Sequence, residues 1–267
     1  MESRAVPGLT RSFAADALGV RVYACQHDMA ADAAQIAAET IQATFARQGF
    51  ARVILASATS QIQFLDALTG LDGIDWARVT LFHMDEYLGI HRDHPASFRR
   101  FMRERVESRV RARAFHYIEG DALEPLKECD RYAGLLRAQP IDLCVLGIGE
   151  NGHIAFNDPP VADFHDPLAI KLVKLDFACR QQQVGEGSFP SVEAVPQYAF
   201  TLTVPALCAA ERLLCVVPER RKAVAVRDCL GGPVTTACPA SYLRTQAHAT
   251  LFIDADSASL LKEGVAL

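Results

Sequence analysis

Short apolar runs alternate along almost the whole chain with longer stretches whose apolar residues recur at helical spacing. The short runs predict strands at 52–56, 79–82, 115–118, 141–146, 172–175, 198–204, 212–217 and 249–254. The longer stretches predict helices at 28–48, 61–68, 98–111, 125–138, 176–184, 206–210 and 220–229, and a short helix from Pro239. We find no internal repeat, low-complexity tract or linker. Regular alternation of strand and helix favours a mostly parallel sheet with helices on both faces. The pattern therefore predicts a single doubly wound, Rossmann-like α/β domain over residues 1–267.

Composition places the chain among globular proteins and limits its partners. Of its 267 residues, 50% are hydrophobic and 22% are charged, with a net charge of −5 and a pI near 5.9. A nucleic-acid surface would need clustered excess lysine and arginine, so we expect no nucleic-acid partner, although one positive pocket for a small anion stays compatible. The chain has no long unbroken apolar run and no signal-peptide layout, which favours a cytoplasmic protein without a membrane partner.

Eight cysteines are scattered along the chain without a C-x-x-C motif or a paired histidine spacing. Cys144 and Cys215 lie inside apolar runs, where a thiol behaves as a small hydrophobic group. We therefore expect reduced, buried thiols and neither a metal site nor a disulfide framework.

The densest group of polar residues follows the apolar run 141–146. Three glycines and four polar side chains follow it, namely Gly147, Gly149, Gly152, Asn151, His153, Asn157 and Asp158. A lone histidine near a strand end is more often structural than catalytic. Here a glycine turn, a histidine and an acid come together after a buried strand, where open α/β sheets bind their ligands. The combination favours chemistry, although the glycine spacing departs from the G-x-G-x-x-G dinucleotide fingerprint.

Two other strand ends carry polar side chains. The turn Ser57-Ala58-Thr59-Ser60 precedes the helix 61–68, where free N–H groups and the helix dipole favour phosphate, although simple capping by a hydroxyl is the better explanation of the turn alone. Asp85 and Glu86 follow the strand 79–82, and solvated loop acids are the simpler interpretation there. If the strands are parallel, these ends and the His153 loop lie at one edge of the sheet. The segment 185–188 is a candidate lid or hinge over that cleft.

Five blocks resemble the glucosamine-6-phosphate deaminases, within the wider superfamily of sugar-phosphate isomerases and phosphogluconolactonases. The blocks are 82–89 (FHMDEYLG), 94–98 (HPASF), 147–159 (GIGENGHIAFNDP), 221–223 (RKA) and 239–241 (PAS). Their order and spacing match that family, and the resemblance spans about Val53 to Asp254. The MDEYLG and GHIAFN blocks are specific and favour the deaminases over the lactonases.

The resemblance implies a cofactor-free conversion of glucosamine 6-phosphate, or an epimer, and water into a ketose 6-phosphate and ammonia. His153 would open the sugar ring by moving a proton from the anomeric hydroxyl to the ring oxygen, a task that suits an ordinary imidazole pKa of about 6.5. Asp85 would remove the C2 proton and deliver a proton at C1, with Glu86 ranked second because it would project elsewhere from an extended segment. The implied phosphate-binding residues are Ser57, Ala58, Thr59, Ser60, Lys222 and, more weakly, Arg180.

The chain departs from the family pattern beside the histidine. Asn151 stands where the family usually has aspartate, and Asp158 where it usually has glutamate. The Asn151 amide oxygen can orient the imidazole but cannot stabilise an imidazolium by charge, so ring opening would be slower or would depend on Asp158. If position 151 still supports His153, the change Asn151→Asp should raise turnover, whereas lower turnover would mean a site built around the amide. The phosphate turn lacks the usual glycines, and no lid arginine is evident near Gly185.

Two alternatives stay open at this point. The same histidine could serve a 6-phosphogluconolactonase-like hydrolase or a plain aldose–ketose isomerase. A non-catalytic sugar-phosphate sensor is the other possibility, in which the altered neighbours of His153 have abolished turnover. In each case the partner is a small sugar phosphate, and the sequence is compatible with a homo-oligomer without specifying one.

Overall fold

The computed structural model describes residues 6–261 and contains one large sheet. Its eight strands follow the order β1 (Leu9–Ala15), β2 (Leu18–Tyr23), β11 (Ala249–Asp254), β10 (Arg212–Val217), β7 (Leu143–Leu146), β3 (Ala51–Leu55), β4 (Val79–His83) and β6 (Ala114–His116). Every neighbouring pair from β2 to β6 is parallel, and β1 runs antiparallel to β2. The predicted α/β fold with a mostly parallel sheet is confirmed, while the ends of the predicted domain, 1–5 and 262–267, lie outside the described residues.

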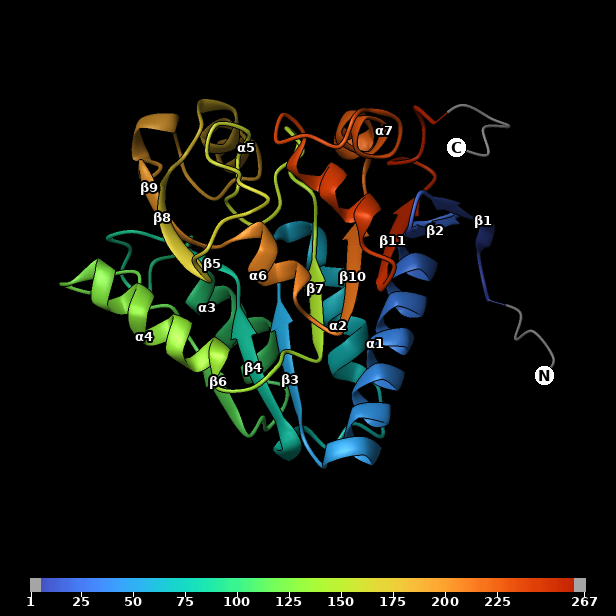
Figure 1. Cartoon of the computed structure of the whole chain (residues 1–267), viewed down its shortest axis with the longest axis horizontal. Coiled ribbons are helices and arrows are strands. Elements are labelled where there is room, and N and C mark those ends of the chain that lie inside the picture. Colours follow the sequence, from blue (N-terminus) through green and yellow to red (C-terminus); the bar gives the residue numbers. More distant parts are fainter. Residues whose placement is uncertain (1–5, 262–267) are drawn as a thin grey trace.

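Helices cover both faces of this sheet (Figure 1). The helices α1 (Gln26–Gln48), α2 (Ile62–Gly70) and α3 (Phe98–Met102) supply apolar residues to one core cluster, and α4 (Pro125–Arg137), α6 (Val204–Cys208) and α7 (Ala223–Gly231) supply the other. Alternate residues of a strand face opposite sides, so Val53 and Leu55 pack in the first cluster and Ile54 in the second. The two clusters explain why the central strands read as unbroken apolar runs.

A second, three-stranded antiparallel sheet lies beside the first. It contains β5 (Asp85–Tyr87), β9 (Tyr198–Leu202) and β8 (Ile170–Lys174) in that order, and α5 (Phe177–Gly185) follows β8 along the chain. A third apolar cluster, which includes Tyr87, Phe156 and Phe189, lies beneath it. The sequence pattern placed 172–175 and 198–204 in one parallel sheet and 83–89 in a loop, which is wrong, because an apolar run does not reveal its pairing partner.

Other element boundaries differ in physically understandable ways. The hairpin β1–β2 was not predicted, because β1 alternates half-buried and exposed residues at the sheet edge. The predicted helix 98–111 is α3 followed by a π-helical turn, Arg103–Glu107. By contrast, α1 ends as predicted at Gly49, which adopts φ +88° and donates its N–H to the Phe45 carbonyl at 2.9 Å.

The short 3₁₀ segments are Thr59–Gln61, Trp76–Arg78, Val192–Ala194, Arg220–Lys222 and Pro239–Thr245. None of the helices within residues 6–261 combines the length and the apolar character needed to cross a bilayer. All eight cysteines are free, and six of them are buried.

The strand order places a crevice between β3 and β7. From β3 the chain moves outward through β4 to β6, returns to β7 on the other side of β3, and then continues outward to β10 and β11. Loops that leave the carboxyl ends of β3 and β7 therefore diverge and leave room between them. These two loops are the hydroxyl-rich turn and the His153 loop.

Candidate active site

A pocket lies beyond the carboxyl ends of β3, β4 and β7. Its walls include Thr59 after β3, Asp85 after β4, His153 after β7, Glu186 after α5, and Lys222 before α7. The three predicted strand ends thus meet in one cavity. Asp85 and His153 face the same space, which is the arrangement that proton transfer at neighbouring atoms of one substrate requires.

Tight backbone geometry holds His153 in place. Its carbonyl oxygen accepts a hydrogen bond from the Gly149 N–H at 2.8 Å, and Gly152 adopts φ +84° in the intervening turn. The imidazole lies directly over Gly149, where a β-carbon would come within 2.2 Å of ring atoms Cε1 and Nε2. Any side chain at position 149 would clash with the imidazole, so the observed position of His153 requires glycine there.

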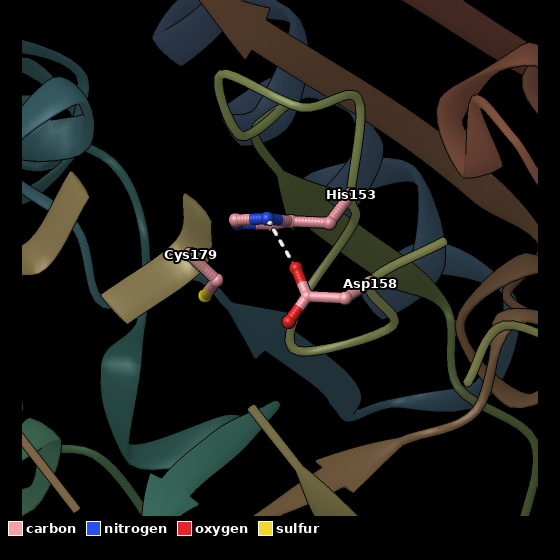
Figure 2. Close-up of side chains that lie close together, drawn as sticks. All are labelled: His153, Asp158 and Cys179. Atoms are coloured by element: carbon pink, nitrogen blue, oxygen red, sulfur yellow. Dashed lines mark ion pairs between the residues drawn. The ribbon is translucent and has the colours of Figure 1, made fainter. Parts of the chain in front are cut away.

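His153 Nδ1 lies 2.9 Å from Asp158 Oδ1, and the Asp158 side chain is completely buried (Figure 2). Burial alone would raise the pKa of Asp158. Interactions with His153, the Asn151 amide and the Asp176 N–H outweigh burial and hold this pKa below its ordinary value. Asp158 is thus an anion beneath the imidazole, suited to orienting the ring and to stabilising its protonated form.

Asn151 contacts Asp158 rather than the imidazole. Its Nδ2 donates to Asp158 Oδ1 at 3.0 Å, and its Oδ1 accepts from the backbone N–H of His153 at 3.1 Å. The expectation that the Asn151 amide oxygen orients the ring is therefore wrong. The structure instead gives Asp158 that position, with Asn151 holding the carboxylate.

Three potential metal ligands gather here, since side-chain atoms of His153, Asp158 and Cys179 all lie within 4.8 Å of one another (Figure 2). Sequence analysis predicted no metal site. The Asp158 oxygens already accept from Asn151 and from the Asp176 N–H, so a metal would have to compete with those donors. The Asp158 carboxylate is thus already engaged by an ion pair with His153 and by hydrogen bonds from Asn151 and Asp176.

Asp85 is placed by β5, where it pairs with Thr201 of β9. Its side chain is buried against the pocket, and its Oδ1 has no hydrogen-bond partner within residues 6–261. Burial, and secondarily the nearby Glu86 carboxylate, raise the pKa of Asp85 well above its ordinary value. A carboxyl group with these properties is ready to accept a proton from a ligand in the pocket.

The Glu86 side chain points away from the pocket, towards the start of α3. It is fully buried and accepts hydrogen bonds from Ser97 Oγ at 2.8 Å and from the N–H groups of Phe98 and Arg99 at 3.1 and 2.9 Å. Glu86 thus ties the start of α3 to β5. It does not contact the pocket, so its contribution is to the support of Asp85.

The hydroxyl-rich turn forms one end of the pocket together with Lys222. Neither Thr59–Gln61 nor α2 has a side-chain capping hydrogen bond, so the capping explanation of this turn does not hold. Ser57 Oγ is buried without a partner in the described part of the chain. Lys222 is 3% exposed, and burial lowers its pKa. A buried cation beside the unpartnered Ser57 hydroxyl is suited to an anion.

The arginine that contacts the hydroxyl-rich turn is not the predicted Arg180. The Arg180 guanidinium donates to the carbonyls of Val192 and Val195, and Arg180 does not line the pocket. Arg221 instead reaches the turn, with its Nη2 donating to Thr59 Oγ1 at 3.3 Å. Arg221 belongs to the 221–223 block, but only the positions of β3 and η5 (Arg220–Lys222) in the folded chain reveal its contact.

The fold defines an open α/β protein with a pocket at the switch point of its sheet, lined by a buried carboxyl group, a histidine and a buried lysine. Residues 24–165 match the family described as glucosamine-6-phosphate isomerases/6-phosphogluconolactonase. The chain is 36% identical over 192 residues to a glucosamine-6-phosphate deaminase of Exiguobacterium sibiricum, covering 72% of this chain and 74% of that one. A deaminase of Bacillus thuringiensis is 35% identical over 193 residues, 72% of each chain. The chain belongs to this family, as the sequence blocks predicted.

Solved structures agree with this assignment. A monomeric glucosamine-6-phosphate deaminase superposes with a TM-score of 0.83 at 29% identity, covering 90% of this chain and 99% of that one. A 6-phosphogluconolactonase from Shewanella baltica superposes with a TM-score of 0.72 at 17% identity, covering 92% of this chain and 100% of the other. The second likeness shows a shared fold alone.

Replacing Gly149 with alanine should disable the site without unfolding the chain. The added methyl group would meet the His153 ring at 2.2 Å, so the ring must move, and a displacement of this size should lower kcat about 100-fold or more. Gly134→Ala in α4 is the matched control, because nothing lies within 4 Å of its β-carbon. Steady-state kinetics of both variants test this, and an unchanged kcat for Gly149→Ala would contradict it.

The geometry around Asn151 reverses the expectation for Asn151→Asp. The new carboxylate would lie about 3.0 Å from Asp158 Oδ1, where the amide now donates. Two carboxylates at that distance repel and raise each other's proton affinity, so turnover near neutral pH should fall roughly tenfold. The loss should shrink at lower pH, where one of the pair binds a proton. A rise in kcat at neutral pH would show that a second charge helps the imidazole.

Proposed function

We propose that this protein is an amino-sugar-6-phosphate deaminase/isomerase that converts glucosamine 6-phosphate, or an epimer, and water into a ketose 6-phosphate and ammonia. The observation that carries the proposal is the shared pocket, in which the buried Asp85 carboxyl and the His153–Asp158 pair lie beside a buried lysine. Curated relatives at 35–36% identity bear the name glucosamine-6-phosphate deaminase, which supports the same reaction.

Ring opening is assigned to His153. Because Nδ1 lies beside Asp158, Nε2 is the ring nitrogen left for the sugar. Nε2 accepts the proton of the anomeric hydroxyl and returns it to the ring oxygen as the bond between C1 and that oxygen breaks, giving the open aldehyde. The Asp158 anion stabilises the imidazolium that exists between these two transfers.

Isomerisation and deamination are assigned to Asp85. Its carboxylate takes the proton from C2, the electrons shift onto the C1 oxygen, and that oxygen takes a proton from water, which gives an enolamine with a hydroxyl on C1. Asp85 returns its proton to C1, which leaves an iminium at C2. The hydroxide left from that water adds to C2, and the nitrogen leaves as ammonia, giving the ketose. The unpartnered oxygen of Asp85 supports this role, because within the described residues no neighbouring donor must be displaced before it accepts a proton.

The lysine end of the pocket is assigned to the phosphate. Lys222 provides charge, and Ser57, Thr59 and Ser60 provide hydroxyl and N–H donors around it. The anchored phosphate sets the distance from the sugar carbons to Asp85 and His153. We further infer a cytoplasmic location, in keeping with eight free cysteines.

Ammonia release from glucosamine 6-phosphate by the purified protein tests the proposal directly. The same assay with galactosamine 6-phosphate addresses the epimer. Acid release from 6-phosphogluconolactone without ammonia formation would favour the hydrolase instead. Thermal stabilisation by sugar phosphates without any turnover would favour a sensor.

Asp85→Asn should remove activity and keep the fold. Loss of a positioned general base costs about 10²- to 10⁴-fold, so we expect kcat for ammonia release to fall about 10³-fold. Circular dichroism and binding of substrate should be preserved. Turnover within about tenfold of the parent chain would rule out Asp85 as the base.

The same substitution should stabilise the protein in a pH-dependent way. Burial raises the pKa of Asp85 above that of the unfolded chain, so the native state loses stability as pH rises from about 4 towards the native pKa. Asn at this position carries no such penalty. In urea unfolding, Asp85→Asn should be more stable than the parent chain at pH 8, and this difference should shrink as pH falls and vanish near pH 4. A pH-independent difference would contradict the raised pKa.

A further inference from the structure

The phosphate end of the pocket contains a carboxylate, that of Glu186. This residue follows α5, lines the pocket, and has a side chain that is only 6% exposed. Its Oε1 lies 3.3 Å from Arg221 Nη1 and accepts from Gln182 Nε2 at 2.8 Å. Its Oε2 accepts from Thr59 Oγ1 at 3.4 Å.

These contacts use donors that suit a phosphate. The Thr59 hydroxyl lies in the anion-binding turn, and Arg221 presents a planar guanidinium that pairs well with phosphate oxygens. Glu186 is also the carboxylate whose charge acts most strongly on the buried Lys222. A negative side chain at the end of the pocket that must receive an anion repels that anion unless it moves or is replaced.

We propose that the Glu186 carboxylate occupies the place of a phosphate oxygen, and that an arriving phosphate displaces it and binds Arg221 and Thr59 instead. Arg221 is thereby a further phosphate-binding residue. Glu186 competes with the phosphate for Arg221 and Thr59, and so lowers the affinity of the pocket for phosphate. The inference rests on the proposed function for the identity of the ligand as a sugar phosphate.

The backbone around Glu186 allows this displacement. The residue lies between Gly185 and Gly187, and a β-carbon added to either glycine would meet no atom within 4 Å, so the segment has open space around it. Gly187 also adopts φ +77°. Arg221 does not lose all support when Glu186 leaves, because Glu219 Oε2 lies 2.6 Å from its Nε. The guanidinium can therefore stay in position and exchange one carboxylate for the incoming phosphate.

Affinity for inorganic phosphate tests the inference, measured by isothermal titration calorimetry on the full chain. Glu186→Gln keeps the size of the side chain and removes the charge, so phosphate should bind about tenfold more tightly, equivalent to about 1.4 kcal/mol. Arg221→Gln should weaken phosphate binding about tenfold or more. Glu219→Gln is the matched control, because it removes a second carboxylate that pairs with Arg221 but leaves Glu186 in place, and it should change the affinity less than about threefold.

Unchanged or weaker phosphate binding by Glu186→Gln, with an intact circular dichroism spectrum, would overturn the inference and make Glu186 a support for Arg221. An equal increase in phosphate affinity for Glu186→Gln and Glu219→Gln would also overturn it, because removal of any negative charge near Arg221 would then explain the effect. These affinities need no turnover. Tighter phosphate binding by Glu186→Gln in a protein that releases no ammonia would therefore reject the proposed reaction while supporting the displacement.

Discussion

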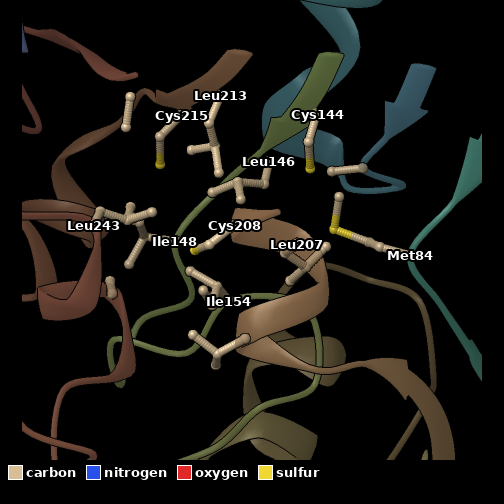
Figure 3. Close-up of a cluster of buried hydrophobic side chains, with 14 of the residues drawn as sticks. Met84, Cys144, Leu146, Ile148, Ile154, Leu207, Cys208, Leu213, Cys215 and Leu243 are labelled. Carbon is tan, nitrogen blue, oxygen red and sulfur yellow. The ribbon is translucent and has the colours of Figure 1, made fainter. Parts of the chain in front are cut away.

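The divergence of the chain at β3 and β7 is the constraint on which the site depends. The loops after these neighbouring parallel strands lead in opposite directions, and the space between their carboxyl ends becomes the pocket. Apolar side chains pack on both faces of these strands, including Ile54 and Leu146 on one face and Val53 and Val145 on the other. Figure 3 shows part of the second cluster, which contains Leu146. A rigid, close-packed base of this kind lets polar loops hold fixed positions above it.

Electrostatics divides the pocket into two parts with different requirements. Around Asp85, burial and the lack of a hydrogen-bond partner for Oδ1 raise the pKa, whereas Asp158 accepts hydrogen bonds that lower its pKa, so two carboxyl groups of the same chemical type differ in proton affinity. At the opposite side, the buried Lys222 and Arg221 lie near the Glu186 carboxylate. Burial weakens screening by water in both parts, so small changes in charge should have large effects on ligand binding and on proton transfer.

The large sheet, the polar strand ends and the family could be predicted from the sequence, because apolar runs, glycines and specific blocks are signals within short segments. Contacts between segments that are distant in the sequence could not be predicted in this way. Arg180 was a weaker candidate for the phosphate, yet its guanidinium donates to the carbonyls of Val192 and Val195. Asn151 was expected to orient the imidazole because it stands where the family usually has aspartate, whereas the fold directs its amide to Asp158. The roles of the predicted site residues stay predictions that the experiments above address.

Pairing register in the small sheet decides which of two adjacent acids, Asp85 or Glu86, faces the pocket. Asp85 lies opposite Thr201, and Glu86 lies opposite Phe200. Successive residues of a strand point to opposite sides, so sliding β5 along β9 by a single residue would exchange their surroundings. The donors that hold the Glu86 carboxylate, which are Ser97 Oγ and the N–H groups of Tyr87, Phe98 and Arg99, would then have no acceptor, and the unpartnered Asp85 oxygen would be lost from the cavity. The hydrogen bonds of Glu86 thus fix the position of Asp85, so a substitution at Ser97 would displace Asp85 without altering any wall of the pocket other than the segment 94–98.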